Sequence, residues 1–217
     1  MRLTPRLITI ALLCCTAAAS DAVFRDDFSR HSSGWPHASG NRGFSIYTDT
    51  GKYQLTPVDD MTFGIIPAPR QARSGNVRIE ADLFMYAGIG AGASGLVCRQ
   101  QDADNLYAFL LTGSPGWNIV KIVNGKLARL ASSPLPRGVM AGAVDTRIAV
   151  ECHGDTLRLF VGGKQIGQAR DASFTTGDSG LMVMAENMAG TSATFDNFLL
   201  RDLSGEASKL QQAGGTH

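Results

Sequence analysis

The sequence predicts an all-β fold, a sandwich of two antiparallel β-sheets. After residue 20 no helical period of useful length appears. Short apolar or alternating segments are separated instead by Gly, Asn, Asp and Pro. This pattern is typical of sandwiches and barrels. The segments Val23–Ser29 and Thr194–Leu200 each set acidic residues between aromatic ones. We expect them to be the first and last strands and to pair at one seam.

Residues 1–20 are predicted to be a signal peptide. Arg2 and Arg6 form a positive start, Leu7–Cys15 is the apolar stretch, and Thr16–Ser20 supplies small residues before a cleavage point. The apolar stretch is too short to span a bilayer. We therefore predict export to the periplasm or the extracellular space.

A lipoprotein is the competing interpretation, because Cys14 or Cys15 would carry the lipid. Bulky Leu12 and Leu13 precede them, where a lipobox needs small residues. Simple secretion is therefore favoured over lipidation.

The composition fits one domain of ordinary size. The chain has 217 residues, of which 44% are hydrophobic, enough for a single core. Its 20 Lys and Arg against 19 Asp and Glu give a net charge of +1. This balance offers no field for nucleic acid or an anionic membrane. We assign residues 21–203 to the sandwich and polar residues 204–217 to a disordered tail.

The strands between the two ends follow from alternation and turn signals. A polar loop is expected over His31–Arg42. Two hairpins are nearly explicit, because Asn124-Gly125 and Gly162-Gly163 are preferred pairs for type I′ turns. The clearest interior strands are Gly75–Phe84, Leu106–Leu111, Trp117–Val123 and Thr156–Val161.

Two cysteines, Cys98 and Cys152, remain once the signal peptide is removed. An even pair in an exported protein favours a disulfide. Within Gly95–Arg99 and Arg147–Cys152, alternation places both thiols on the apolar side. Such a bridge closes a loop of about 54 residues and is worth roughly 4 kcal/mol in the chain-entropy model. The alternative is a pair of buried free thiols.

A series of motifs runs through residues 23–203 in a fixed order. The chain resembles the concanavalin A-like lectin/glucanase superfamily and, within it, bacterial laminin-G-like jelly rolls and 3-keto-disaccharide hydrolase domains. The resemblance implies a two-sheet antiparallel jelly-roll sandwich with one curved sheet, and a ligand on the concave face or its rim loops. The motifs are Phe24-x-Asp-Asp-Phe28, Ser33-Gly-Trp35, Arg78-Ile-Glu-Ala-Asp82, Gly95-Leu-Val-Cys-Arg99, Leu157-Arg-Leu-Phe-Val-Gly-Gly163, Gly180-Leu-Met182 and Phe195-Asp-Asn-Phe198.

The resemblance also implies a structural calcium ion between the first and last strands. In similar jelly rolls an acid of the first strand and an aspartate of the last strand bind it, and here these positions are Asp27 and Asp196. Two carboxylates with carbonyls and water would supply the hard oxygen ligands that Ca²⁺ prefers. Asp27 stands where the related enzymes usually have Glu, so its reach is shorter. The alternative is that both acids cap turns or accept backbone hydrogen bonds.

No catalytic residue is predicted. Glu80-x-Asp82 is similar to part of the Glu-x-Asp-x-(x)-Glu strand of family-16 glycoside hydrolases, but Phe84 and Met85 stand where the second Glu belongs. A retaining glycosidase needs two carboxyl groups about 5 Å apart. Solvent-face acids on an amphipathic strand are therefore the favoured interpretation.

A candidate ligand surface comes from side chains expected to share a face. Trp117 and Lys121 have the same parity on one strand, Tyr107 lies on the strand before, and Arg99 is expected to project away from the core, opposite Cys98. Aromatic rings and polar groups that converge in a concavity suit a sugar, although a strand aromatic often serves packing instead. The predicted ligand-binding set is Arg99, Tyr107, Trp117, Lys121 and Glu186.

These observations predict an exported, non-catalytic carbohydrate- or glycan-binding sandwich with a saccharide ligand. One alternative is a glycoside hydrolase or lyase that acts on modified saccharides, as the resemblance implies for related domains. The other is a structural or protein-interaction module of the cell envelope, with a protein as its partner. Exposure of the Trp117 and Tyr107 faces in a groove would favour the first, and their burial the last.

Overall fold

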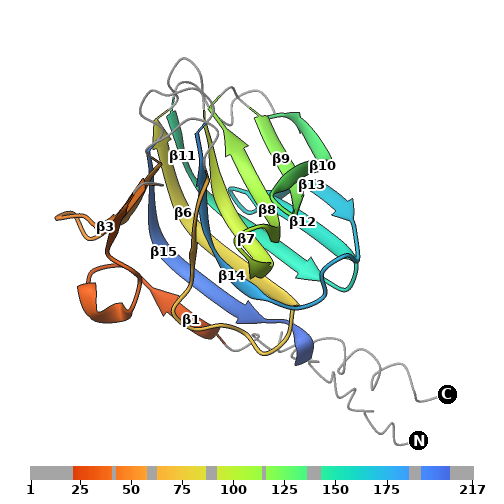
Figure 1. The fold of residues 1–217 in the computed structure, drawn as a ribbon, viewed down its shortest axis with the longest axis horizontal. Helices are drawn as coiled ribbons and strands as arrows, with labels where there is room; N and C mark the ends of the chain where they lie inside the picture. The colour runs from red at the N-terminus through yellow and green to blue at the C-terminus, as the bar shows by residue number, and fades with distance from the viewer. Residues whose placement is uncertain are drawn as a thin grey trace, which may run out of the picture.

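The computed structural model describes residues 22–40, 43–57, 63–86, 92–113, 116–135, 143–185 and 192–205. They form two antiparallel sheets, a jelly-roll sandwich (Figure 1). The nine-stranded sheet has the order β13-β12-β11-β6-β15-β4-β3-β2, with β1 paired to β15, and the six-stranded sheet has the order β10-β9-β8-β7-β14-β5. The predicted signal peptide lies outside the described residues, as does the predicted tail after residue 205.

The nine-stranded sheet contains the first and last strands, and a short 3-10 helix, η1 (His31–Ser33), follows the first. Its strands are β1 (Ala22–Asp26), β2 (Ala38–Gly40), β3 (Gly43–Tyr47), β4 (Tyr53–Pro57), β6 (Val77–Tyr86), β11 (Ala143–His153), β12 (Thr156–Val161), β13 (Lys164–Arg170) and β15 (Ala193–Asp202). Those of the six-stranded sheet are β5 (Phe63–Pro67), β7 (Ala93–Asp102), β8 (Asn105–Thr112), β9 (Gly116–Val123), β10 (Lys126–Pro134) and β14 (Asp178–Met184).

The predicted seam between the chain's two ends is confirmed. Strand β1 runs antiparallel along β15, with Asp26 opposite Phe198 (Figure 1). The two predicted hairpins are also present, and all four of their turn residues have the positive φ that type I′ turns require. They are Asn124, Gly125, Gly162 and Gly163.

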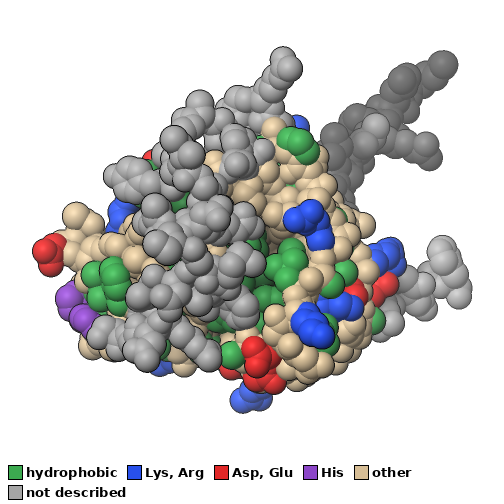
Figure 2. Space-filling model, turned by 45° about the horizontal axis from the view of Figure 1, so that its top comes forward, with side chains coloured by type: hydrophobic (Ala, Val, Ile, Leu, Met, Phe, Trp, Pro, Cys, Tyr) green, Lys and Arg blue, Asp and Glu red, His purple; other side chains and the backbone are tan. Residues whose placement is uncertain are grey.

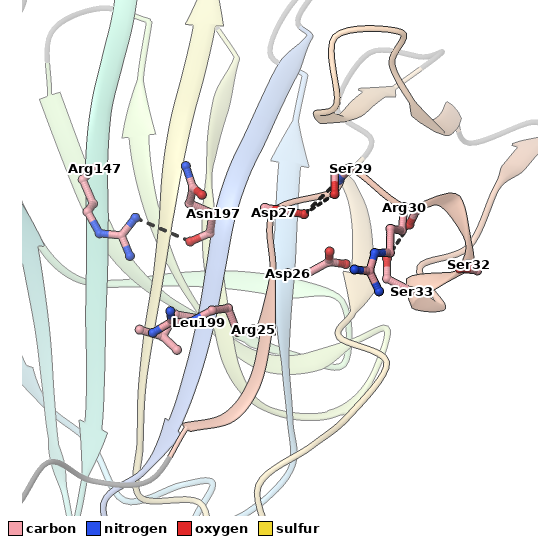
Figure 3. A pocket seen from close by; sticks show the side chains of 10 residues that line it. All are labelled: Arg25, Asp26, Asp27, Ser29, Arg30, Ser32, Ser33, Arg147, Asn197 and Leu199. Atoms are coloured by element: carbon pink, nitrogen blue, oxygen red, sulfur yellow. Dashed lines mark hydrogen bonds between the residues drawn. The ribbon is translucent and has the colours of Figure 1, made fainter.

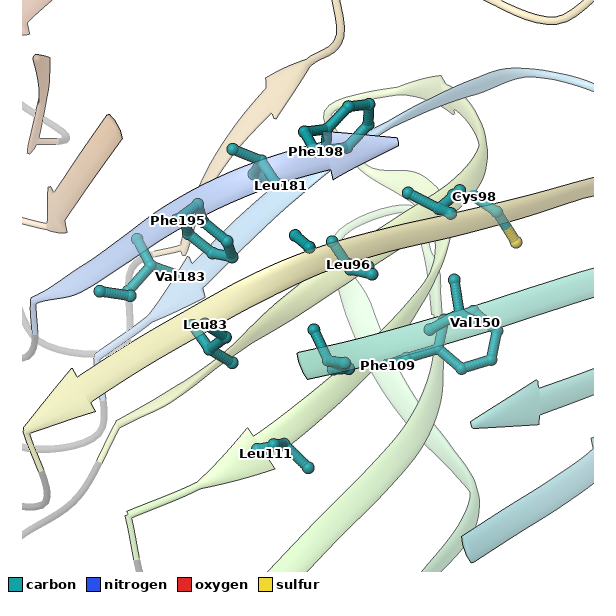
Figure 4. Close-up of a cluster of buried hydrophobic side chains, with 14 of the residues drawn as sticks. Leu83, Leu96, Cys98, Phe109, Leu111, Val150, Leu181, Val183, Phe195 and Phe198 are labelled. Atoms are coloured by element: carbon teal, nitrogen blue, oxygen red, sulfur yellow. The ribbon is translucent and has the colours of Figure 1, made fainter. Parts of the chain in front are cut away.

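The core lies between the sheets and is closed by a disulfide. Leu96 and Phe109 of the six-stranded sheet face Leu83 and Phe195 of the nine-stranded sheet (Figure 4). The predicted Cys98–Cys152 bond is present and joins β7 to β11. Both cysteines are fully buried, so the bond ties the two layers together inside the core.

The central strands β7, β8 and β14 of the six-stranded sheet are buried on both faces. Along β8, one set of alternate side chains enters the core between the sheets, and the other set belongs to a second apolar cluster on the opposite face. Strands buried on both faces lose the alternation of polar and apolar residues, which explains the unbroken apolar run at residues 106–111. The first set is Tyr107, Phe109 and Leu111, and the second is Leu106, Ala108 and Leu110.

Two local predictions need correction. The polar stretch His31–Arg42 is not a plain loop, because it contains η1 and β2. Strand β1 ends at Asp26, so Asp27 follows the strand and is exposed, whereas Asp26 is buried. The parity of Phe24, Asp26 and Phe28 sets that side of the segment toward the core.

Charged side chains of both signs are present on the face of the molecule drawn in Figure 2. On the face drawn in Figure 2, neither sign gathers in an extended patch among the described residues. This distribution matches the net charge of +1. In the part of the chain that the structure describes, no helix combines the length and hydropathy that crossing a membrane requires.

Candidate functional site

The aromatic residues of the predicted ligand surface lie in the core. Trp117 is 7% exposed and Tyr107 is fully buried. The Trp117 ring packs against Gly167, where a Cβ atom would come within 2.6 Å of its carbons. The parity of these side chains was predicted correctly, but their shared face is the one between the sheets. They therefore offer no exposed platform to a sugar. By the criterion drawn from the sequence, this burial favours a structural or protein-interaction module, so a sugar site must lie elsewhere on the molecule.

Lys121 belongs to a polar cluster at the edge of that core. Its Nζ donates to Asp171 Oδ2 at 2.6 Å and to Ser173 Oγ at 2.8 Å. Tyr107 donates its hydroxyl hydrogen to the same carboxylate at 2.5 Å. Burial acts to raise the pKa of Asp171, but the hydrogen bonds from Lys121, Tyr107 and Ser173 outweigh it and hold this pKa well below 3.8. The cluster thus closes the edge of the sandwich.

This cluster predicts a loss of stability in acid. Because the pKa of Asp171 is lower in the folded state, its contribution is fully present above the unfolded value of about 3.9 and is lost as the pH falls toward the folded value. The free energy of unfolding of the wild type should therefore drop below about pH 4. Asp171→Asn should flatten that drop, as measured by urea unfolding between pH 7 and pH 2. Equal slopes in the two proteins would contradict the prediction.

Arg99 is also buried, at 1% exposed, and the expectation that it projects into solvent is wrong. The register of β7 shifts after Cys98, and Arg99 adopts a positive φ of 52°. This bulge turns the side chain inward. Its guanidinium donates to the carbonyl oxygens of Gly75, Gly154 and Phe174. Arg99 therefore connects the segments that contain Gly75, Gly154 and Phe174 through hydrogen bonds. The remaining member of the predicted set, Glu186, lies outside the described residues.

A polar cleft opens on a different part of the molecule, where β1 and η1 meet β15 and β11. Its volume is about 710 Å³. Figure 3 shows the lining side chains converging from these elements. The lining consists of Arg25, Asp26, Asp27, Ser29, Arg30, Ser32, Ser33, Arg147, Asn197 and Leu199.

An aromatic cluster fixes the β1–η1 wall of the cleft. The Trp35 ring lies 5.3 Å from that of Phe28 and 5.0 Å from that of Phe198. Asp26, beneath the cleft, accepts hydrogen bonds from Trp35 Nε1 at 2.8 Å and Phe28 N at 2.9 Å. Tyr47 accepts from Trp35 N at 3.1 Å. These contacts hold the chain between β1 and β2 against the core, so the polar residues above it are preorganised.

The exposed residues of this wall carry its polar chemistry. Asp27 Oδ1 accepts from both the backbone nitrogen and the hydroxyl of Ser29, at 3.1 and 2.6 Å. These bonds, with a smaller contribution from the charge of Arg30, lower the pKa of Asp27. Ser33 Oγ donates to the Arg30 carbonyl at 2.9 Å. The wall therefore presents a carboxylate, hydroxyl groups and a guanidinium.

The opposite wall is built by a bulge in β15. The pairing of β15 with β6 shifts register after Asp196, and Asn197 has a φ of 50°. Asn197 Nδ2 donates to Asp82 Oδ2 at 2.8 Å. Arg147 reaches over from β11 and bonds Asp82 Oδ1 at 2.8 Å and Glu80 Oε2 at 3.3 Å. The guanidinium of Arg147 is therefore already paired with Asp82 and Glu80.

Of the predicted calcium pair, Asp27 lines this cleft, and Asp196 precedes the lining residue Asn197 in the chain. Burial raises the pKa of Asp196, and the negative charges of Asp82 and Asp27 add to the rise. Asp27 and Asp196 are thus near enough to repel each other, which is the situation a bound cation relieves. Within the described ranges, no three His, Cys, Asp or Glu side chains are grouped closely enough to hold a metal ion. A calcium ion here would draw its other ligands from carbonyl groups and water.

Sequence reasoning missed most of the cleft. The resemblance carried Asp27 into the predicted site, and Asn197 stood beside Asp196 in a motif, but Arg25, Arg30 and Arg147 had no pattern of their own. Their proximity depends on β1 pairing with β15 and on β11 lying two strands from β15, on the far side of β6. Only the motif Ser33-Gly-Trp35 could have pointed to this wall of the cleft, because it indicates a turn whose tryptophan packs into the core.

Comparison with known proteins shows the fold. No family model matches the chain, and no curated protein sequence does. Among solved structures, the carbohydrate-binding module CBM66 from Bacillus subtilis is similar at a TM-score of 0.60 and 24% identity, covering 78% of this chain and 96% of that one. A β-glucanase from Bacillus licheniformis is similar at 0.59 and 12%, covering 85% and 99%.

A third structure was solved with a sugar and a metal ion. The exoplasmic/lumenal domain of VIP36, in a form bound to Ca²⁺ and Man3GlcNAc, has a TM-score of 0.54 and 14% identity, with 76% of this chain and 86% of that domain covered. These neighbours include a binding module and an enzyme, so they do not decide between binding and hydrolysis. Together with the strand order, they show that this chain has the concanavalin A-like jelly-roll fold.

Proposed function

We propose that this chain is an exported, non-catalytic carbohydrate-binding module whose ligand occupies the cleft between β1, η1 and β15. The observation that carries the proposal is the cleft itself, about 710 Å³ in volume and lined almost entirely by polar side chains. This volume lies within the range of small-ligand sites, roughly 300–1,000 Å³. Export is supported by the disulfide, a bond typical of oxidising compartments.

The lining suits recognition by hydrogen bonds. Guanidinium, hydroxyl, carboxylate and amide groups supply both donors and acceptors, which is what adjacent sugar hydroxyl groups require. The described lining contains no aromatic ring. Ring stacking therefore contributes little in this site, and the orientation of a bound sugar depends on polar contacts.

We propose that the chain is non-catalytic because its candidate catalytic acids are already bonded to other side chains of the protein. Glu80 and Asp82 both accept salt bridges from Arg147, and Asp82 also accepts from Asn197. Acids engaged in this way are held as acceptors and not poised for proton transfer. One observation favours the second candidate, glycoside hydrolysis: the raised pKa of Asp196 beside two other carboxylates resembles a catalytic acid.

A screen of the signal-free protein against a glycan array tests the proposal. Ser32 is exposed, lines the cleft and makes no side-chain hydrogen bond among the described contacts, so Ser32→Trp should block the cleft and abolish binding. Ser133→Trp, on exposed β10, is the matched control and should bind like the wild type. Binding that survives Ser32→Trp would show that the ligand binds outside the cleft. Release of reducing ends from a bound glycan would establish hydrolysis instead.

We further propose a structural calcium ion held by Asp27 and Asp196, which would neutralise their repulsion and fix β1 to β15. Calcium should raise the melting temperature, by the equivalent of about 2.7 kcal/mol at a hundredfold excess over Kd. Asp196→Asn should abolish this response, and Asp178→Asn, which removes an exposed acid of the other sheet, should keep it. Because the pKa of Asp196 is raised, the response should weaken as the pH falls. An unchanged melting temperature in calcium and in EDTA would exclude the site.

A further inference from the structure

We propose that the cleft selects acidic saccharides and that the guanidinium groups of Arg25 and Arg30 bind their carboxylate or sulfate groups. This inference rests on the proposed function and names the class of its ligand. It starts from a difference between the arginines: some form salt bridges with acids of the protein, and the two in the cleft do not.

Four arginines on strands of the nine-stranded sheet have acidic partners. Arg78 and Arg158 bond Glu151, Arg147 bonds Glu80 and Asp82, and Arg170 bonds Asp155. Arg25 and Arg30 line the cleft, are exposed, and form no salt bridge with any described residue. The charge of Arg30 is felt by Asp27 but without a contact between the two groups. Two guanidinium groups thus remain available to a ligand.

Neither acid of the lining forms a salt bridge with Arg25 or Arg30. Both oxygens of Asp26 accept hydrogen bonds, from Phe28 and Trp35, and the residue is only 7% exposed. Asp27 uses Oδ1 for both donors of Ser29. Neither carboxylate is therefore turned onto Arg25 or Arg30, and the two cations are not neutralised by the wall that carries them.

The placement of the two arginines indicates an extended ligand. Arg25 and Arg30 lie on opposite sides of the end of β1, with Asp26 and Asp27 between them (Figure 3). Asp27 disfavours an anion at the centre, so acidic groups are expected at the two ends of the cleft. A guanidinium binds a carboxylate or a sulfate through paired hydrogen bonds that are stronger than neutral ones. Serine hydroxyls and Asn197 would then contact the uncharged parts of an oligosaccharide.

The selectivity must come from these local contacts. The whole chain has a net charge of only +1, so long-range attraction does not concentrate anions at its surface. Binding should nonetheless weaken as salt rises, because exposed charge pairs are screened.

The test compares three probes by isothermal titration calorimetry: trigalacturonate, its neutral methyl ester, and a sulfated oligosaccharide. Removing both cations in Arg25→Gln/Arg30→Gln should weaken binding of the anionic probe roughly tenfold to a hundredfold. Lys126→Gln/Arg129→Gln removes the same charge from exposed β10 and should bind like the wild type. All four side chains are exposed, and circular dichroism with a melting curve checks that each variant is folded.

Preference for trigalacturonate or the sulfated probe, lost in the cleft variant and kept in the control, supports the inference and identifies the acidic group. Equal affinity for the methyl ester, unaffected by the cleft variant, overturns the inference and leaves carbohydrate binding standing. Equal losses in both double variants overturn it as well, because the effect is then one of overall charge. Absence of binding to any probe, together with an empty glycan array, overturns both proposals.

Discussion

Arg99→Ala is expected to lower the free energy of unfolding by about 3–5 kcal/mol. The guanidinium fills a site that is 1% exposed and donates to three backbone carbonyls, with Asn76 Oδ1 a fourth acceptor at 3.3 Å. Truncation leaves these acceptors in a place that water reaches poorly, and each unsatisfied group costs about 1–3 kcal/mol. The loops at residues 75, 154 and 174 lose their common anchor at the same time.

The measurement is urea unfolding of the wild type, Arg99→Ala, Arg99→Lys and the control Arg129→Ala. Lysine keeps the charge but cannot reach several carbonyls in the fixed geometry of a guanidinium, so it should recover only part of the loss. Arg129 is exposed, and its removal should change the free energy of unfolding by less than about 0.5 kcal/mol. A loss below about 1 kcal/mol for Arg99→Ala would show that water replaces the side chain.

Removal of the Cys98–Cys152 disulfide in Cys98→Ala/Cys152→Ala is expected to cost roughly 4 kcal/mol. The two residues are 54 positions apart and join β7 to β11, one strand from each sheet. The bond therefore limits the unfolded chain over a long loop and also connects the two layers of the native core. Both cysteines are fully buried, so the substitutions add a small packing defect to the loss of the cross-link.

Denaturation with and without a reductant provides the check. The wild type should lose stability when reduced in the unfolded state, whereas the double variant should not respond to the reductant. Thiol labelling under denaturing conditions should find no free cysteine in the oxidised mature protein. Two labelled thiols, or equal stability of the wild type with and without reductant, would refute the prediction.

Much of the fold could be predicted from local patterns. Alternation located β12 and most of β6 and β9, and the turn pairs at residues 124–125 and 162–163 fixed two hairpins. The parity of Cys98 and Cys152 was enough to predict a bond between strands far apart in the chain, because inward-facing cysteines of an exported protein have few other partners. These features depend on the period of a strand and the conformation of a turn, which a short segment carries by itself.

Predictions from strand alternation failed where a bulge interrupted the two-residue period of the strand. Arg99 follows an inward cysteine and should face outward, but the bulge in β7 inserts it into the interior. Tyr107 and Trp117 share a face as predicted, yet nothing in their own segments says whether that face meets solvent or the second sheet. Strand β8 is buried on both sides, so the segment around Tyr107 has no polar side to distinguish them.

By itself the sequence determined that this protein is an antiparallel sandwich with paired ends and one disulfide, because each of these features follows from periodicity, turn chemistry or a count of cysteines. Only the tertiary structure decided where the polar cleft lies and which residues line it. Arg25 and Arg30 come from the first strand and its loop, Arg147 from β11, and Asn197 from a bulge in β15. Strand order brings these segments together, and strand order depends on long-range pairing that no single segment encodes.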